Sequence, residues 1–193
     1  MNFLAHLYLS GDNAKFMVGN FIGDFVKGRN LHEHFEPEIV KGIGLHRAID
    51  EFTDHHAVVL KSKIRLRTKY RHYAPVIVDI FYDHFLSKYW HNYDNRPLPD
   101  YAAHAYKTIG SFASILPEEV KNLLPHMVKG NWLVNYGTLD GIQRALTGTS
   151  RRTKFDSKMN ESVVDLQTHY EEFKNEFQEF FPELKKFSTA FVH

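Results

Sequence analysis

The stretch from Pro75 to Trp90, PVIVDIFYDHFLSKYW, constrains the fold more than any other part of the chain, because it reads as one amphipathic helix. Pro75 suits the first helical position, where its missing N–H is not needed. Apolar side chains recur at helical spacing and form a broad stripe that other elements must cover. They are Val76, Ile77, Ile80, Phe81, Phe85 and Leu86.

The same helix carries Asp79 and Asp83, four residues apart and therefore on one face, followed directly by His84. Two carboxylates stacked on a largely apolar helix repel each other and are costly to desolvate. A divalent metal ion between them would remove both costs, as would an arginine, and we favour the metal. In the alternative, both aspartates face water and His84 packs as an ordinary aromatic side chain.

The chain has 193 residues, 43% hydrophobic and 24% charged, which fits one globular domain over residues 1–193. A formal net charge of +1 does not indicate a nucleic-acid-binding protein. The absence of cysteine excludes disulfides, thiolate metal sites and a cysteine nucleophile. The apolar start, MNFLAHLYLSGDN, is too short to span a membrane and is a poor signal peptide. We therefore expect a cytoplasmic protein with no membrane association, and the oligomeric state stays open.

A helix is predicted over Ala14–Val26, with Asp12 or Asn13 as its N-cap. Gly19 and Gly23 would form a bare stripe that another helix can approach closely. Asn20 and Asp24 form an adjacent polar stripe, and Asp24 needs a partner because its neighbours are apolar. His6 lies in the short buried segment Asn2–Leu9, where the alternative to a functional role is a hydrogen-bonded core histidine.

The next predicted helix begins at Pro37 and carries His46, Asp50 and Asp54 at spacings of four residues, so all three share one face. Asp54, or Thr53 before it, has an alternative role as the cap of the following helix. His55 and His56 fall at this junction.

The segment Lys61–Arg71, KSKIRLRTKYR, alternates cations with other residues. On a helix it gives two basic flanks around an apolar strip of Leu66, Tyr70 and Tyr73. One interpretation is a solvated amphipathic helix whose basic side chains cover the edge of the core. The other is a docking surface for an acidic partner or a phosphate.

Further helices are predicted over 101–116, 117–130, 138–146 and 161–180, and Pro182 is expected to restart a short terminal helix. Strand patterns are weak throughout, so the chain is predicted to be an all-α single-domain helical bundle.

The candidate site residues lie in the first 90 residues and come from at least three helices. They are His6, Asp24, His46, Asp50, Asp79, Asp83 and His84. Mixed imidazole and carboxylate ligands suit zinc, manganese or iron, and carboxylate-rich sets favour manganese or magnesium. Such a metal would hold a phosphate oxygen and lower the pKa of a bound water. Arg47 and Arg71 are candidates to balance phosphate charge.

Several motifs, in this order and spacing, resemble the acyl carrier protein phosphodiesterase family. They are MNFLAHL, GNFIGDFVKG, GIGLHRAIDEFTDHH and APVIVDIFYDHFLSKYW, followed by the WLVNYGTLDGIQRAL stretch and the Arg151-Arg152 pair. The resemblance implies hydrolysis of the phosphodiester that joins 4′-phosphopantetheine to a serine of acyl carrier protein. It also implies an HD-like helical metal hydrolase that favours Mn²⁺, with Mg²⁺, Fe²⁺ or Zn²⁺ as alternatives.

On these positions the resemblance makes Asp24 a metal-site or catalytic carboxylate and places His6 near the site. Arg47, beside His46, stays the candidate catalytic arginine on its position alone. The metal cluster would comprise His46, Asp50, Asp79, Asp83 and His84. The His-Asp order of ordinary HD hydrolases is reversed here, in Asp54-His55 and Asp83-His84.

Because acyl carrier proteins are strongly acidic, the resemblance also makes the basic segment a candidate carrier-binding strip through Lys61, Arg65, Lys69 and Arg71. Two other hypotheses stay open. One is an HD-like hydrolase acting on a small nucleotide or another phosphodiester. The other is a non-enzymatic helical module that binds an acidic protein.

Overall fold

The computed structural model describes residues 1–28 and 30–192, and within these ranges the regular secondary structure is entirely helical. The α-helices are α1 (Phe3–Leu9), α2 (Ala14–Ile22), α3 (Pro37–His55), α4 (Ala57–Tyr70), α5 (Ala74–Lys88), α6 (Leu98–Ser111), α7 (Glu118–Lys129), α8 (Trp132–Asn135), α9 (Leu139–Ser150), α10 (Val163–Thr168) and α11 (Tyr170–Val192). Short 3₁₀ turns are η1 (Gly23–Phe25), η2 (Leu31–Glu33), η3 (Arg71–Tyr73), η4 (Trp90–Asn92), η5 (Ala113–Ile115) and η6 (Met159–Glu161). The all-α prediction is confirmed, whereas HD-like remains a prediction.

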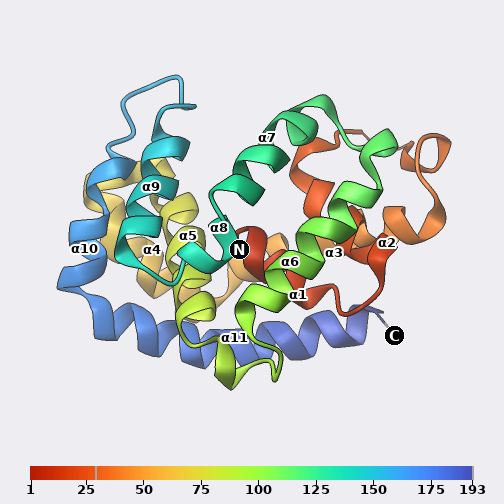
Figure 1. Ribbon diagram of the computed structural model, residues 1–193. Helices are drawn as coiled ribbons and strands as arrows, with labels where there is room; N and C mark the ends of the chain where they lie inside the picture. Colours follow the sequence, from red (N-terminus) through yellow and green to blue (C-terminus); the bar gives the residue numbers. More distant parts are fainter. Residues whose placement is uncertain (29, 193) are drawn as a thin grey trace.

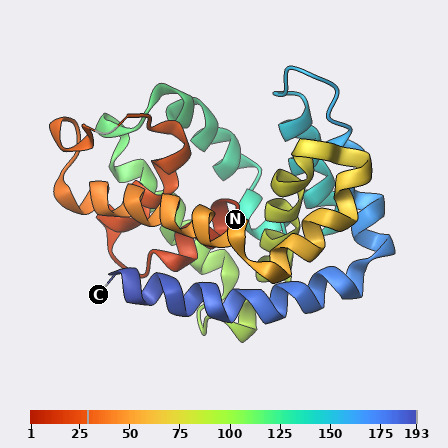
Figure 2. The same cartoon turned by 180° about the vertical axis from the view of Figure 1, so that it is seen from behind.

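Two groups of helices stand side by side on one long helix (Figures 1 and 2). We call α2, α3, α6 and α7 the α3 lobe, and α4, α5, α9 and α10 the α5 lobe. The N-terminus and α1 lie between them, and α11 runs along the base, where it contacts α1, α3, α4 and α5. Within the described ranges, no helix combines the length and apolar character needed to cross a membrane.

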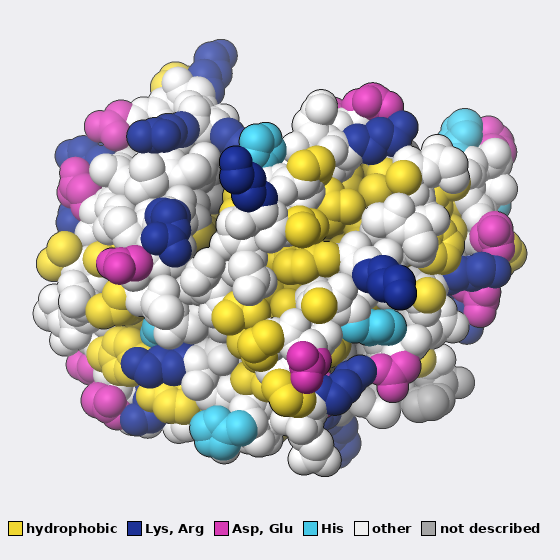
Figure 3. Space-filling model, viewed as in Figure 1, with side chains coloured by type: hydrophobic (Ala, Val, Ile, Leu, Met, Phe, Trp, Pro, Cys, Tyr) yellow, Lys and Arg dark blue, Asp and Glu magenta, His cyan; other side chains and the backbone are white. Residues whose placement is uncertain are grey.

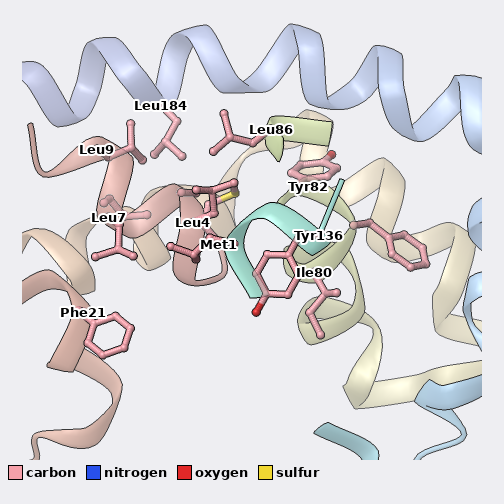
Figure 4. Packing of buried hydrophobic residues seen from close by; sticks show 14 of the residues in the cluster. Met1, Leu4, Leu7, Leu9, Phe21, Ile80, Tyr82, Leu86, Tyr136 and Leu184 are labelled. Carbon is pink, nitrogen blue, oxygen red and sulfur yellow. The ribbon is translucent and has the colours of Figure 1, made fainter. Parts of the chain in front are cut away.

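The α5 helix is the central element, as its apolar stripe predicts. Its side chains from Ile80 to Ser87 are all buried. Figure 4 shows how α1 and α5 meet over the base helix, with Leu4 of α1 and Leu86 of α5 near Leu184 of α11. The helix ends at Lys88, and Trp90 belongs to the following turn η4.

The backbones of α2 and α3 touch at glycines, as the bare stripe on α2 predicts. A Cβ atom on Gly19 would overlap the carbonyl oxygen of Ile39, and one on Gly42 would overlap the carbonyl oxygen of Phe16. The close approach brings His46 of α3 against the C-terminal end of α2, where a Cβ on Gly23 would overlap the imidazole ring. These glycines therefore set the distance between two elements that carry candidate site residues.

Several predicted boundaries differ from the structure. The first predicted helix ends at Ile22, so Asp24 lies in η1, although Asn13 is its N-cap as expected. Neither Thr53 nor Asp54 caps α4, because α3 continues to His55 and the cap is His56, whose Nδ1 accepts from Val58 N. Pro182 does not restart a helix.

The predicted 161–180 helix is instead divided into α10 and α11, and α11 continues through Pro182 to Val192. A proline inside a helix removes one backbone hydrogen bond, but Phe181 and Leu184 on either side are fully buried. Their packing holds the helix together across the missing bond.

Candidate metal centre

Three side chains converge from α1 and α3. One ligand atom from each of His6, His46 and Asp50 lies within 4.8 Å of the other two. The Nε2 atom of His6 is 3.2 Å from Asp50 Oδ1, and that of His46 is 3.2 Å from Asp50 Oδ2. The two imidazole rings stack with centroids 4.0 Å apart. The spacing of four residues on α3 places His46 and Asp50 on one face, as predicted.

Two further predicted carboxylates border this group. Asp24 reaches it from η1, with Oδ1 3.0 Å from His46 Nε2 and a side chain that is 70% exposed. Asp79 reaches it from α5, because the α-amino group of Met1 lies 3.0 Å from Asp79 and 3.6 Å from Asp50. Four elements, η1, α1, α3 and α5, thus contribute to one site.

Asn20 orients both imidazole rings. Its buried side chain accepts a hydrogen bond from His6 Nδ1 at 2.8 Å through Oδ1, and its amide group donates to the His6 carbonyl and to Ser10 Oγ. Its backbone carbonyl accepts from His46 Nδ1 at 2.7 Å. Since both acceptors hold a proton on Nδ1, the Nε2 atom of each ring is the one that faces Asp50 and is available to a metal.

In each of the two imidazole rings, both nitrogen atoms therefore face a hydrogen-bond acceptor. Nε2 of His6 faces Asp50 and the Met1 carbonyl oxygen at 3.1 Å, and Nε2 of His46 faces Asp24 and Asp50. A neutral imidazole has only one N–H, and two charged rings at this stacking distance would repel each other. A cation between the Nε2 atoms and the carboxylates satisfies all of these groups, so the residues fit a divalent metal.

The ionisation of the group supports this conclusion. Burial lowers the pKa of His46, but hydrogen bonds and charge from Asp24 and Asp50 outweigh it and raise the pKa to about 9. Burial would raise the pKa of Asp50, but hydrogen bonds from His46 and His6 hold that pKa well below its usual range. Burial and the charge of His46 lower the pKa of His6. A positive charge is thus favoured at His46 Nε2, where a metal would bind.

The structure does not bring Asp83 and His84 into this group. Asp83 is fully buried and accepts hydrogen bonds from the backbone N–H groups of Leu4 and Ala5 at 2.7 and 3.2 Å, at the start of α1. Burial raises the pKa of Asp83 to about 7. One helical turn separates Asp83 from Asp79, and that is enough to give the two carboxylates different partners, since Asp83 is fully buried and the Asp79 side chain is 27% exposed.

His84 faces α8 and α11 instead. Its Nδ1 donates to the Tyr136 carbonyl oxygen at 2.7 Å, and its Nε2 lies 2.9 Å from the Tyr170 hydroxyl, which donates to it. Burial lowers the pKa of His84 to about 4. The neutral ring therefore has both nitrogens satisfied within the core, which corresponds to the alternative of an ordinary packed histidine.

Arg47 points away from the group: its guanidinium donates to the carbonyl oxygens of Val26 and Gly28. These hydrogen bonds hold the backbone after η1 against α3.

The basic segment on α4 is partly used inside the fold. Arg65 forms two hydrogen bonds with Glu176 of α11, at 2.7 and 2.8 Å, and Lys69 lies near Glu161 and Asp165. Asp54, expected on the site face, pairs with Lys63 at 2.7 Å. The side chains of Lys61 and Arg71 are exposed and form no ion pair with any described residue. Of the four predicted carrier-binding residues, Arg65 and Lys69 are thus paired with carboxylates, and Lys61 and Arg71 are not.

A cavity of about 670 Å³ opens beside the candidate metal group, between the two lobes. Asp24, Asp50 and Asp79 line one end of it. Apolar residues line much of the rest. On the face seen in Figure 3, hydrophobic side chains gather mainly over α6 and α7 of the α3 lobe. The opposite wall is α9 and the turn after it, with Gly141, Arg144, Ala145, Gly148, Thr149 and Arg152.

Sequence reasoning missed Asn20 and Arg144 as functional candidates. Asn20 was placed on the polar stripe with Asp24, and its burial among apolar neighbours was the signal for a hydrogen-bonding role. Arg144 lies eight residues before Arg152 with Gly148 midway, a spacing that places all three on one helical face.

Known proteins resemble this chain over nearly its whole length. The family model for acyl carrier protein phosphodiesterase matches residues 1–184. Proteins named acyl carrier protein phosphodiesterase from Escherichia coli strains CFT073 and E24377A are each 36% identical over 186 residues, covering 95% of this chain and 95% of the relative. No solved structure matches significantly. The chain therefore belongs to the acyl carrier protein phosphodiesterase family.

Proposed function

We propose that this protein is a metal-dependent phosphodiesterase that hydrolyses the bond between 4′-phosphopantetheine and the serine of holo-acyl carrier protein. The products are the apo-carrier and free 4′-phosphopantetheine. The observation that carries the metal dependence is the pair of stacked imidazoles, whose Nε2 atoms both face carboxylate oxygens. Membership of the family supports the substrate. We place the protein in the cytoplasm, with no nucleic acid as partner.

His6, His46 and Asp50 are the proposed metal ligands, and Asp24 is the nearest further carboxylate. Two imidazole nitrogens with carboxylate oxygens suit Mn²⁺, Fe²⁺ or Zn²⁺ better than Mg²⁺, which prefers oxygen ligands alone. We propose Mn²⁺. When bound, the metal would polarise the phosphate and make a nearby water more acidic.

The residues around the proposed ligands have distinct tasks. Asn20 holds the imidazoles in the tautomer that exposes Nε2. Asp24 is the exposed carboxylate at the edge of the cavity, and the hydrogen bond from His46 lowers its pKa. It therefore stays ionised and is placed to accept the proton of the attacking water. Asp79 adds negative charge on the α5 side.

For the carrier we propose a docking face on α4 that the ion pairs leave free. Lys61, Arg67 and Arg71 are exposed there and have no ion pair within the described ranges. Leu60 and Ile64 on the same helix are 46% and 58% exposed. A surface of cations beside exposed aliphatic side chains fits an acidic, amphipathic partner.

The test is incubation of the purified protein with holo-carrier and Mn²⁺, followed by mass measurement of the carrier. We expect loss of the phosphopantetheine mass, and no loss with Asp24→Ala or His46→Ala. Asp54→Ala is the matched control, since Asp54 lies one turn after Asp50 on α3 but pairs with Lys63. It should keep full turnover. A folded wild-type protein that leaves the carrier mass unchanged with Mn²⁺, Mg²⁺, Fe²⁺ and Zn²⁺ would refute the function.

A further inference from the structure

Two arginines line the cavity on its α9 wall, opposite the metal group. Arg144, in the middle of α9, and Arg152, in the turn that follows the helix, both line the cavity. Neither forms an ion pair with any residue that the structure describes. The side chain of Arg152 has one weak hydrogen bond, 3.4 Å to Thr149 Oγ1. Arg65 and Arg96, by contrast, are paired with carboxylates.

If the ligand of the cavity is an anion, positively charged side chains are needed to offset the carboxylates that line it. Three carboxylates, Asp24, Asp50 and Asp79, line one end. A divalent metal leaves that end with one negative charge, and the α-amino group of Met1 near Asp50 brings it only to neutrality. Apart from its contact with the metal, a phosphodiester would gain little electrostatic attraction at that end. The two guanidinium groups make the cavity positive as a whole.

Gly148 keeps the space in front of this wall empty. A Cβ atom built on Gly148 meets nothing within 4 Å. Glycine inside a helix costs up to about 1 kcal/mol relative to alanine, and here no packing contact within the fold requires it. Gly148 lines the cavity, so the missing side chain leaves room for a ligand along α9 between the two arginines.

We propose that Arg144 and Arg152 bind the phosphate of the 4′-phosphopantetheine arm and select a phosphorylated arm over one without phosphate. The inference rests on the proposed function and assigns these two residues within it. Guanidinium groups suit this task because they offer planar pairs of donors that match two phosphate oxygens. The phosphate then lies between the acidic end and the α9 wall, and the rest of the arm lies along the apolar part of the cavity.

The experiment measures binding to the Mn²⁺-loaded protein by calorimetry, with 4′-phosphopantetheine and with pantetheine, which lacks the phosphate. Wild type should bind the phosphorylated ligand more tightly. Arg144→Gln and Arg152→Gln should each weaken that binding about tenfold, the loss expected for one charge-assisted hydrogen bond, and leave pantetheine binding unchanged. Arg144→Lys should recover part of the loss. Arg151→Gln is the matched control, since Arg151 does not line the cavity.

A second pair of variants tests the space itself. Gly148→Leu should fill the cavity and weaken binding of both ligands. Gly110→Leu on α6 is its control, because a Cβ on Gly110 also meets nothing within 4 Å and this residue lies outside the cavity. Both variants should melt at the same temperature.

Equal wild-type affinity for the two ligands would overturn the inference, as would an unchanged phosphate preference in both arginine variants. If the variants weaken binding of apo-carrier but not of 4′-phosphopantetheine, the arginines contact carrier carboxylates and the inference is wrong. Failure of the proposed function is distinguishable, because wild type would then not turn over holo-carrier.

Discussion

Replacing Asn20 with alanine should remove the hydrogen bond that orients the His6 imidazole and keep the one that orients the His46 imidazole. Asn20 is fully buried, and its side chain makes three hydrogen bonds: to His6 Nδ1 at 2.8 Å, to the His6 carbonyl at 2.7 Å and to Ser10 Oγ at 2.9 Å. His6 Nδ1 loses its acceptor, whereas Ser10 Oγ still donates to the His6 carbonyl oxygen. Each of the three lost bonds costs about 1 kcal/mol. The free energy of unfolding should therefore fall by about 3 kcal/mol.

The same change should weaken metal binding through His6 alone. Asn20→Ala removes the acceptor that fixes the His6 tautomer, but it keeps the backbone carbonyl that accepts from His46 Nδ1. Loss of such a supporting hydrogen bond typically lowers metal affinity about 10- to 100-fold. The Mn²⁺ affinity of Asn20→Ala should fall within this range rather than vanish.

The assay is a Mn²⁺ titration of the folded variant, beside denaturant unfolding of the metal-free protein. Asn13→Ala provides the control on the same helix. Asn13 caps α2 by accepting from Lys15 N and Phe16 N, so its loss costs about 1 kcal/mol and should leave Mn²⁺ affinity unchanged. An Asn20→Ala protein that binds Mn²⁺ within twofold of wild type would show that the tautomer argument is wrong.

Three further predictions concern protons and charges. Because the pKa of His46 is about 9, a proton must leave Nε2 before a metal binds, and Mn²⁺ affinity should rise about tenfold per pH unit between pH 6 and 8; a pH-independent titration would contradict this. Arg65→Glu should destabilise the fold by about 3 kcal/mol, because it leaves Glu176 without its partner. Lys61→Glu should instead keep the melting temperature and raise KM for the carrier. If Lys61→Glu lowered the melting temperature and Arg65→Glu changed only KM, the assignment of Arg65 to the fold and Lys61 to carrier binding would be wrong. Because burial lowers the pKa of His84 to about 4, the unfolded chain takes up a proton near pH 6.5 that the folded chain does not. Between pH 7 and 4.5, the free energy of unfolding of wild type should then fall by about 2 kcal/mol more than that of His84→Gln. An equal fall in the two proteins, measured by denaturant unfolding, would disprove this.

Helical spacing predicted the parts of the site that lie within one element. His46 and Asp50 share a face of α3 because they are four residues apart, and Gly19 and Gly23 form the surface that α3 approaches. These inferences need only the helical period. The neighbouring Asn20 carried the same positional signal, but its role depends on hydrogen bonds to His6 and His46 that only the packed structure supplies.

The same period could not show which element each face meets. Asp79 and Asp83 share a face of α5, yet Asp79 faces the metal group and Asp83 meets the start of α1. Arg65 is predicted from the sequence to bind a carrier, but it forms an ion pair with Glu176 of α11, more than a hundred residues later in the chain. Long-range partners of this kind decide whether a charged residue is free, and spacing along one helix does not contain them.

The long base helix has a consequence for how the cavity can change shape. α11 contacts α1, α3, α4 and α5, and it buries Phe177, Phe180 and Leu184 completely. A single packed rod therefore ties the two lobes together below the site and resists any hinge motion there. The upper rim consists of shorter pieces, α7, α8 and α9. We therefore expect that any opening of the cavity to admit a bulky substrate takes place by movement of these shorter helices.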